Sequence, residues 1–211
     1  MMGRRFGAAK VVFLCDQTYA NPIEFRNFAV RENSMELLDL YDSDLKPTGQ
    51  TVERGQLVPP GMMIPIVAVF IHNNEGKYLI QKVSEAKGGY YATTAGHVKS
   101  GEMDFTVSML RELKEELGLS VTKSELKLLR IRRYNYKFTL LYMLKSNVPI
   151  DMLRLQKEEV ESVQWLSREE IEKLCDEGKF NKIHYQLLLD CEERLTSLHL
   201  KTKNGKTKTQ N

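Results

Sequence analysis

The chain has 211 residues, 42% of them hydrophobic, and its 31 basic residues exceed its 28 acidic residues by only three. This composition suits one compact domain with extensions and excludes a wholly disordered chain, while the longest apolar run, 62–71, contains a proline and is too short to cross a bilayer. The three cysteines, at 15, 175 and 191, fit neither a metal site nor a disulfide framework, so we expect a cytoplasmic protein in a reducing setting.

The first 34 residues show no sustained hydrophobic period. We predict that they form a poorly ordered N-terminal extension, which is either part of the natural chain or lies upstream of a start at Met35. From Met35 the pattern changes. Residues 35–41 predict a strand, and the turn-rich residues 42–49 predict a turn after it.

Strand and helix patterns then follow one another along the chain. Strands are expected at 63–71 and 77–82, forming a hairpin around an Asn/Gly turn, at 90–96, at 126–133 and 136–144, paired around Asn135, and at 162–166. Helices are expected at 103–117, from a Ser167–Glu170 capping box to about 175, and along the apolar stripe of Ile183, Leu187, Leu188, Cys191 and Leu195. This order predicts an α+β fold with a mixed sheet.

Charge is distributed unevenly along the chain. Residues 1–34 carry five basic and three acidic residues, and the polar segment 201–211, predicted to be a flexible tail, carries four lysines. Residues 35–200 therefore carry 22 basic and 25 acidic residues, and the segment 102–116 alone, with five acids and two bases, accounts for that net charge of −3. This distribution argues against nucleic-acid binding by the folded part and favours a site that holds a cation.

The segment 96–119, GHVKSGEMDFTVSMLRELKEELGL, carries the most informative pattern. On a helix, Glu112, Glu115 and Glu116 share one face, with Leu110, Leu113 and Leu117 on the opposite side. Three neighbouring carboxylates repel one another unless a cation neutralises them, and their hard oxygens suit Mg²⁺ or Mn²⁺. The alternative is a solvated acidic helix face, but the Gly-rich loop directly before the helix favours a metal site.

The same segment resembles the signature of the Nudix hydrolases. That signature runs Gly, five residues, Glu, seven residues, Arg-Glu, an aliphatic, any residue, Glu-Glu, any residue, Gly and an aliphatic. The chain supplies these in order as Gly96, Glu102, Arg111, Glu112, Leu113, Glu115, Glu116, Gly118 and Leu119. One residue more than the signature allows separates Glu102 from Arg111, and we expect it near 103–105, where Asp104 is an alternative to Glu102.

The resemblance covers about residues 35–198 and implies a Nudix domain over 35–200. It implies the Nudix fold, a mixed β-sheet sandwiched between helices with a catalytic loop–helix–loop. It also implies a Mg²⁺ site, with Mn²⁺ as a possible substitute, whose ligands are Gly96 through its carbonyl, Glu112, Glu115 and Glu116. The residues expected to be catalytic are Glu112, Glu115, Arg111 and Glu102. Such a metal neutralises a diphosphate and activates a water molecule.

Residues outside the signature are candidates for the remaining roles. A general base is sought among Glu158, Glu159 and Glu161, which are otherwise ordinary surface charges. The candidates for substrate binding are Lys82, His97, Tyr134 and Tyr136. A plain loop histidine and an exposed hairpin tip explain His97 and the tyrosines equally well. The expected partner is a small-molecule diphosphate, with no membrane partner and a homodimer as the commonest assembly.

Three further motifs, 37–55, 79–82 and 93–102, resemble the isopentenyl-diphosphate-isomerase-like branch of the Nudix hydrolases. A true isomerase of that branch needs a cysteine where this chain has Ala95. The resemblance therefore favours Mg²⁺-dependent cleavage of the diphosphate linkage of a nucleoside diphosphate derivative or a related organic diphosphate. The alternatives are an isomerase-like enzyme and a non-catalytic module that senses a nucleotide.

Overall fold

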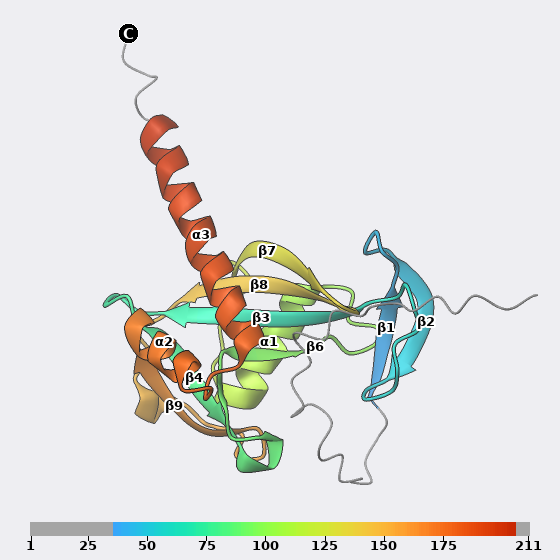
Figure 1. Ribbon diagram of the computed structural model, residues 1–211, viewed down its shortest axis with the longest axis horizontal. Helices are drawn as coiled ribbons and strands as arrows, with labels where there is room; N and C mark the ends of the chain where they lie inside the picture. Colours follow the sequence, from blue (N-terminus) through green and yellow to red (C-terminus); the bar gives the residue numbers. More distant parts are fainter. Residues whose placement is uncertain (1–35, 206–211) are drawn as a thin grey trace, which may run out of the picture. The chain divides into compact units, whose positions relative to one another are not determined.

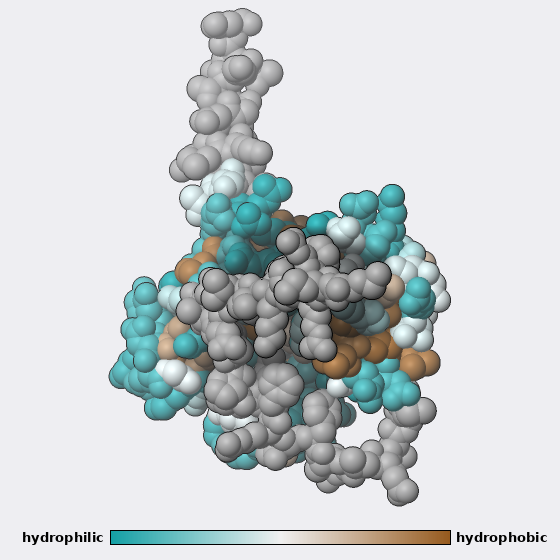
Figure 2. All heavy atoms as spheres, turned by 45° about the vertical axis from the view of Figure 1, so that its right-hand side comes forward, coloured by the Kyte–Doolittle hydropathy of each residue, from teal (hydrophilic) through white to brown (hydrophobic). Residues whose placement is uncertain are grey.

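The computed structural model describes residues 36–205, which are coloured in Figure 1. The predictions made for residues 1–34 and for 206–211 lie outside this range. No helix in the described range is long and apolar enough to cross a membrane. Hydrophilic residues cover most of the described surface that is visible in Figure 2, as expected where apolar side chains fill an interior.

The described part of the chain contains nine strands in two sheets. The smaller sheet is an antiparallel pair, β1 (Leu37–Tyr41) and β2 (Pro47–Glu53), in which β2 includes residues that we had predicted to be a turn. The larger sheet contains β3 (Ile64–His72), β4 (Tyr78–Val83), β5 (Tyr91–Ala92), β6 (Thr94–His97), β7 (Lys127–Tyr134), β8 (Lys137–Lys145) and β9 (Val160–Leu166).

The larger sheet is mixed, as predicted. Strand β3 lies at its centre, parallel to β8 and antiparallel to β6, while β4 pairs with β9 and β5, and β7 forms an antiparallel pair with β8 around Asn135. The predicted hairpin of β3 and β4 is correct only at its turn, because the two strands are paired only at His72 and Tyr78. Beyond that point β6 occupies the edge of β3, and β4 turns away to pair with β9.

Three α-helices cover the larger sheet: α1 (Phe105–Leu117), α2 (Arg168–Asp176) and α3 (Lys182–Gly205). Two short 3₁₀-helices, η2 (Glu85–Lys87) and η3 (Ile150–Met152), lie in loops. The predicted capping box of Ser167 and Glu170 opens α2. The C-terminal helix α3 continues into the first residues of the segment 201–211 that was predicted to be a tail.

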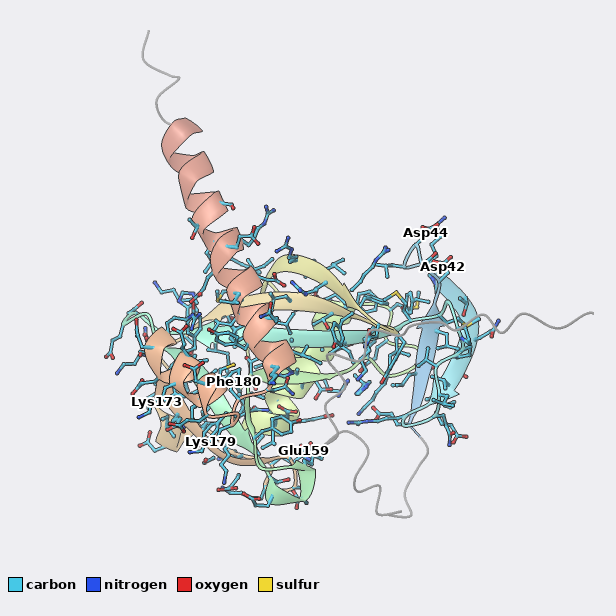
Figure 3. All side chains as sticks on the ribbon, viewed as in Figure 1. Asp42, Asp44, Glu159, Lys173, Lys179 and Phe180 are labelled. Carbon is cyan, nitrogen blue, oxygen red and sulfur yellow. The ribbon has the colours of Figure 1, made fainter. Side chains whose placement is uncertain are left out.

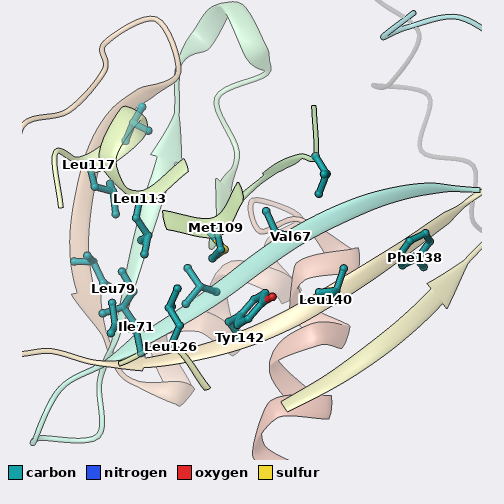
Figure 4. Close-up of a cluster of buried hydrophobic side chains, with 14 of the residues drawn as sticks. Val67, Ile71, Leu79, Met109, Leu113, Leu117, Leu126, Phe138, Leu140 and Tyr142 are labelled. Atoms are coloured by element: carbon teal, nitrogen blue, oxygen red, sulfur yellow. The ribbon is translucent and has the colours of Figure 1, made fainter. Parts of the chain in front are cut away.

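Two apolar clusters fill the opposite faces of the larger sheet. The first lies between the sheet and α1 and includes Val67, Met109 and Leu113 (Figure 4). The second lies between the sheet and helices α2 and α3 and includes Phe70 and Leu188. Because side chains alternate along a strand, β3 supplies both clusters. The sheet is therefore sandwiched between helices, with α1 and α3 on opposite sides of β3 in Figure 1.

Helix α1 has clear start and stop signals. Asp104 is its N-cap and accepts a hydrogen bond from the backbone N–H of Thr106 at 2.9 Å, so the helix begins two residues later than predicted. It ends at Gly118, whose positive φ of 67° suits glycine. Leu113 and Leu117 are buried as predicted, and each such burial stabilises the fold by about 2 kcal/mol.

Candidate functional site

Arg111, in the second turn of α1, is the centre of the acidic cluster. Its Nε and Nη2 atoms donate to the two oxygens of Glu102 at 2.8 and 3.1 Å. Its Nη1 donates to Glu112 at 2.8 Å and to Glu115 at 3.0 Å, and Nη2 also donates to the carbonyl of His97 at 3.0 Å. These five hydrogen bonds use all five N–H groups of a guanidinium. Arg111 therefore holds three carboxylates and the end of β6 together.

Glu102 reaches Arg111 despite the extra residue in the loop. One of its oxygens also accepts a hydrogen bond from the backbone N–H of Lys99 at 3.1 Å. Burial alone would raise the pKa of Glu102, but the hydrogen bonds from Arg111 and the loop lower it. Asp104 caps α1 and forms an ion pair with Lys123 instead. The structure thus brings Glu102, and not Asp104, to the cluster, and the loop accommodates the extra residue around the exposed Met103.

Glu112 and Glu116 are buried carboxylates, only 8% and 7% exposed. Burial raises the pKa of Glu116 to about 8 despite a hydrogen bond from Gln81, and the charges of Glu112 and Glu159 add to the rise. Burial likewise raises the pKa of Glu112, against the opposing effect of Arg111. The pKa values of both buried carboxyl groups are raised, and a cation bound by both would stabilise their ionised forms.

Gly96, on β6, lies directly against Glu112. A Cβ atom on Gly96 would lie 2.0 Å from Cδ and 2.1 Å from Oε1 of Glu112, so only glycine allows this close approach. The carbonyl of Gly96 and the carboxylates of Glu112, Glu115 and Glu116, the ligands expected from the sequence, would provide only oxygen donors, which suit Mg²⁺ or Mn²⁺.

The carboxylates of Glu112, Glu115 and Glu116 do not converge on one point. No group of three His, Cys, Asp or Glu side chains among residues 36–205 is already arranged as a metal-ligand set. Arg111 binds oxygens of Glu112 and Glu115, and the side-chain amide of Gln81 donates to Glu116 at 3.1 Å. Binding of a divalent cation by these oxygens therefore requires some of these hydrogen bonds to be exchanged for metal coordination.

The structure does not bring Lys82 to the carboxylates of α1. Its Nζ donates to Glu161 at 2.9 Å and to Glu85 at 3.0 Å. Because neighbouring side chains of a strand point to opposite faces, Lys82 faces away from Glu116, toward which Gln81 points.

His97 joins the cluster through its backbone. Its carbonyl accepts from Arg111, whereas strand alternation places its imidazole on the face opposite to the Cβ direction of Gly96. Burial, with smaller contributions from the charges of Arg54, Lys137 and Lys87, lowers the pKa of His97 to about 3.

Tyr134 and Tyr136 flank the tip of the β7–β8 hairpin. Tyr136 is 45% exposed, and Lys137 Nζ lies 5.3 Å from the centre of its ring. Lys137 pairs with Ile64 at the beginning of β3, and His97 pairs with Ile66 two residues further on. The tyrosines therefore lie at the same end of the sheet as the carbonyl of His97.

Two residues of the site were not predicted. Gln81 donates to Glu116, and its own carbonyl oxygen accepts a hydrogen bond from the Thr94 hydroxyl at 3.1 Å. Gln81 and Thr94 are both buried polar side chains. A polar residue within a short apolar strand pattern is the sequence feature that could have identified them, because buried polar groups need hydrogen-bond partners.

The three glutamates considered as a general base have different partners in the structure. Glu159, labelled in Figure 3, forms an ion pair with Lys87, and its charge acts on Glu116. Glu161 instead holds Lys82, and Glu158 contributes its backbone carbonyl to the Ser84 hydroxyl. Glu159 is therefore the member of this group with an electrostatic link to the carboxylate cluster.

The sequence of the chain is similar to those of known proteins. Residues 62–191 match the family described as the NUDIX domain. The chain is 30% identical over 169 residues to the uncharacterized Nudix hydrolase lmo0368 of Listeria monocytogenes, an alignment that covers 78% of this chain and 99% of that protein.

Solved structures are similar in fold. DR0079 from Deinococcus radiodurans has a TM-score of 0.60 at 20% identity, over 72% of this chain and 97% of that chain. The NUDIX domain of Shewanella oneidensis NrtR, solved in complex with ADP ribose, has a TM-score of 0.51 at 15% identity, over 63% of this chain and 88% of that chain. These likenesses, together with the sheet and its helices, confirm the predicted α+β fold.

Proposed function

The chain belongs to the Nudix hydrolase family, whose members act on diphosphate linkages, and we propose that it cleaves the diphosphate linkage of a nucleoside diphosphate derivative or a related organic diphosphate with Mg²⁺ as cofactor. The observation that carries the proposal is the buried group of carboxylates around Gly96. Glu112 and Glu116 are buried there at a cost in desolvation, and the missing Cβ of Gly96 leaves the space that the Glu112 carboxylate occupies.

Each residue of the cluster has a distinct part in the proposed reaction. A divalent cation bound there would neutralise the charge of the diphosphate and lower the pKa of a bound water molecule. Arg111 fixes Glu112 and Glu115 relative to the helix, and Gln81 orients Glu116. We propose Glu159 as the proton acceptor, because its loop is attached to α1: the Gln156 N–H donates to the Glu116 carbonyl at 3.0 Å, and the Glu159 N–H donates to the Gln156 carbonyl at 2.9 Å.

The residues at the tip of the β7–β8 hairpin support the proposed substrate class. Tyr134 and Tyr136 at the exposed hairpin tip offer aromatic faces to a nucleobase, and Lys137 beside them offers a cation to a phosphate. ADP ribose, the ligand of the similar NrtR domain, belongs to this class. Lys82 is held by Glu85 and Glu161, so we assign it no contact with a phosphate.

The alternatives have less support. Ala95 places a methyl group where an isomerase of the related branch requires a thiol. The extra residue between Glu102 and Arg111 is the one departure from the Nudix signature, and such a departure would favour a non-catalytic sensor. Because Glu102 contacts Arg111 despite that residue, this feature no longer favours a sensor.

A substrate screen tests the proposal. Nucleoside diphosphate derivatives, including ADP ribose, and isoprenoid diphosphates are incubated with and without Mg²⁺, and the cleaved phosphate esters are measured. We expect turnover of a nucleoside diphosphate derivative that requires Mg²⁺ and is lost in Glu116→Gln. Equal, background-level rates for the wild type and Glu116→Gln on every substrate would refute a hydrolase. Isomerisation of isopentenyl diphosphate by the wild type would establish the alternative.

A further inference from the structure

Strand β1 holds the turn that precedes Glu102. The backbone carbonyl of Leu37 accepts a hydrogen bond from the Ser100 N–H at 2.8 Å. The carboxylate of Asp39 accepts from the Ser100 hydroxyl at 2.6 Å and from the Gly101 N–H at 2.9 Å. Lys99 and Glu102 close the turn, since the Glu102 N–H donates to the Lys99 carbonyl at 3.1 Å. Both central N–H groups of this turn are therefore bound by β1.

The strand that makes these contacts is itself firmly attached. Leu38 and Leu40 are 1% and 2% exposed and pack with Ile64 at the start of β3. Tyr41 exchanges two backbone hydrogen bonds with Met63, at 2.8 and 2.9 Å. Successive side chains of β1 alternate between faces, so Asp39 projects from the face opposite to the buried leucines.

The same face of β1 also contacts the start of α1. The ring of Tyr41 lies 5.9 Å from that of Phe105, the first residue of the helix. The loop between β6 and α1 is thus fixed on both sides of Glu102: by Asp39 before it and by Tyr41 after it. Glu102 in turn makes two hydrogen bonds to Arg111, which holds Glu112.

We propose that Asp39 is a positioning residue for the metal site, acting through the turn at Ser100 and Gly101 on Glu102 and Arg111. This inference rests on the proposed function, because it concerns the same carboxylates. Strand β1 lies outside the residues 62–191 that match the NUDIX domain, so Asp39 adds a contribution from a part of the chain beyond that match.

A pair of variants on one hairpin tests the proposal. Asp39→Ala removes two hydrogen bonds to the catalytic loop. Asp42→Ala removes two comparable bonds, from the N–H groups of Asp44 and Lys46 within the β1–β2 turn, and serves as the matched control (Figure 3). Three quantities are measured on the full chain: Mg²⁺ affinity by calorimetry, kcat and KM at saturating Mg²⁺, and hydrogen exchange of the Ser100 and Gly101 amides.

For Asp39→Ala we expect faster amide exchange at Gly101 and a Mg²⁺ dissociation constant raised about tenfold or more. We also expect a similar fall in kcat, with KM little changed. Changes of this size are typical when a residue that orients a metal ligand through a hydrogen bond is removed. Asp39→Asn, which keeps one acceptor oxygen, should fall between Asp39→Ala and the wild type. Asp42→Ala should match the wild type in Mg²⁺ affinity and kcat.

Two results would overturn the inference alone. The first is an active, Mg²⁺-binding wild type whose kcat and Mg²⁺ affinity do not change in Asp39→Ala. The second is an equal loss in Asp39→Ala and Asp42→Ala, which would mean that any loosening of the hairpin has the same effect. A wild type with neither turnover nor Mg²⁺ binding would instead refute the proposed function, and this inference with it.

Discussion

Replacing Glu116 with glutamine should stabilise the metal-free protein at neutral pH, although it removes a proposed metal ligand. The carboxyl group is 7% exposed, and burial raises its pKa to about 8 from 4.5. An amide of the same shape keeps an oxygen that can accept the hydrogen bond from Gln81 and carries no charge. The variant therefore avoids the cost of keeping a proton on Glu116, which is ionised in the unfolded chain at this pH.

Proton linkage determines the direction and the size of the change in unfolding free energy. Between pH 4.5 and about 8 the folded wild type keeps the Glu116 proton that the unfolded chain releases, so its stability falls as pH rises through that window. At 1.36 kcal/mol for each pH unit, the loss reaches about 3 kcal/mol near pH 7. The variant has no such proton, so the difference in unfolding free energy between variant and wild type should grow by this amount from about pH 4 to about pH 7.

Urea unfolding in the presence of a chelator, at several pH values, measures this difference. The control is Glu115→Gln, whose side chain is 44% exposed and which should stay within about 0.5 kcal/mol of the wild type. Saturating Mg²⁺ should then stabilise the wild type and not Glu116→Gln, because a ligand that binds the folded state shifts unfolding. A difference between Glu116→Gln and the wild type that does not change with pH would refute the reasoning.

Three further predictions concern other positions. Gly96→Ala should fold, as judged by circular dichroism, but lose about 100-fold or more in kcat, because the new methyl group displaces Glu112 by an ångström or more; near wild-type kcat would contradict the close approach. Glu159→Gln should lower kcat by about 100-fold with KM unchanged, whereas Glu161→Gln should not, and equal kinetic effects would exclude the assigned proton acceptor. Burial lowers the pKa of His184 to about 4 from 6.5, so stability should be lost as pH falls between these values, by up to about 3 kcal/mol. His184→Gln should remove that loss in thermal unfolding, and an unchanged acid profile would argue against the neutral buried imidazole.

Contacts between residues close in the sequence could be predicted, whereas contacts between residues far apart in the sequence could not. Helix α1 and its cluster of Glu112, Glu115 and Glu116 come from one segment, where periodicity fixes which side chains share a face. The close pairing expected for β3 and β4 failed because β6, a later segment, takes the edge of β3. No local pattern distinguishes a strand that pairs with its neighbour from one that pairs elsewhere.

The same dependence on distant segments explains why the sequence could not show which side chains of β4 and of the loop before β9 lie near Glu116. Lys82 and Gln81 are neighbours in β4, and only the packing of the sheet against α1 decides which of them faces Glu116. Glu159 could not be distinguished from Glu161, because the register of β9 against β4 determines which carboxylate approaches the cluster. The contact of Glu102 with Arg111 was accessible from the sequence, because both residues belong to one loop–helix segment.

The parallel pairing of β3 with β8 has a consequence for how the protein is made. Ile64 can pair with Lys137 only after the whole intervening segment, including α1, has been synthesised, and β4 must wait still longer for β9. Non-local pairings of this kind slow folding. A nascent chain that ends before residue 160 therefore lacks the β9 partner of β4, and the proposed site cannot be assembled until translation of the domain is almost complete.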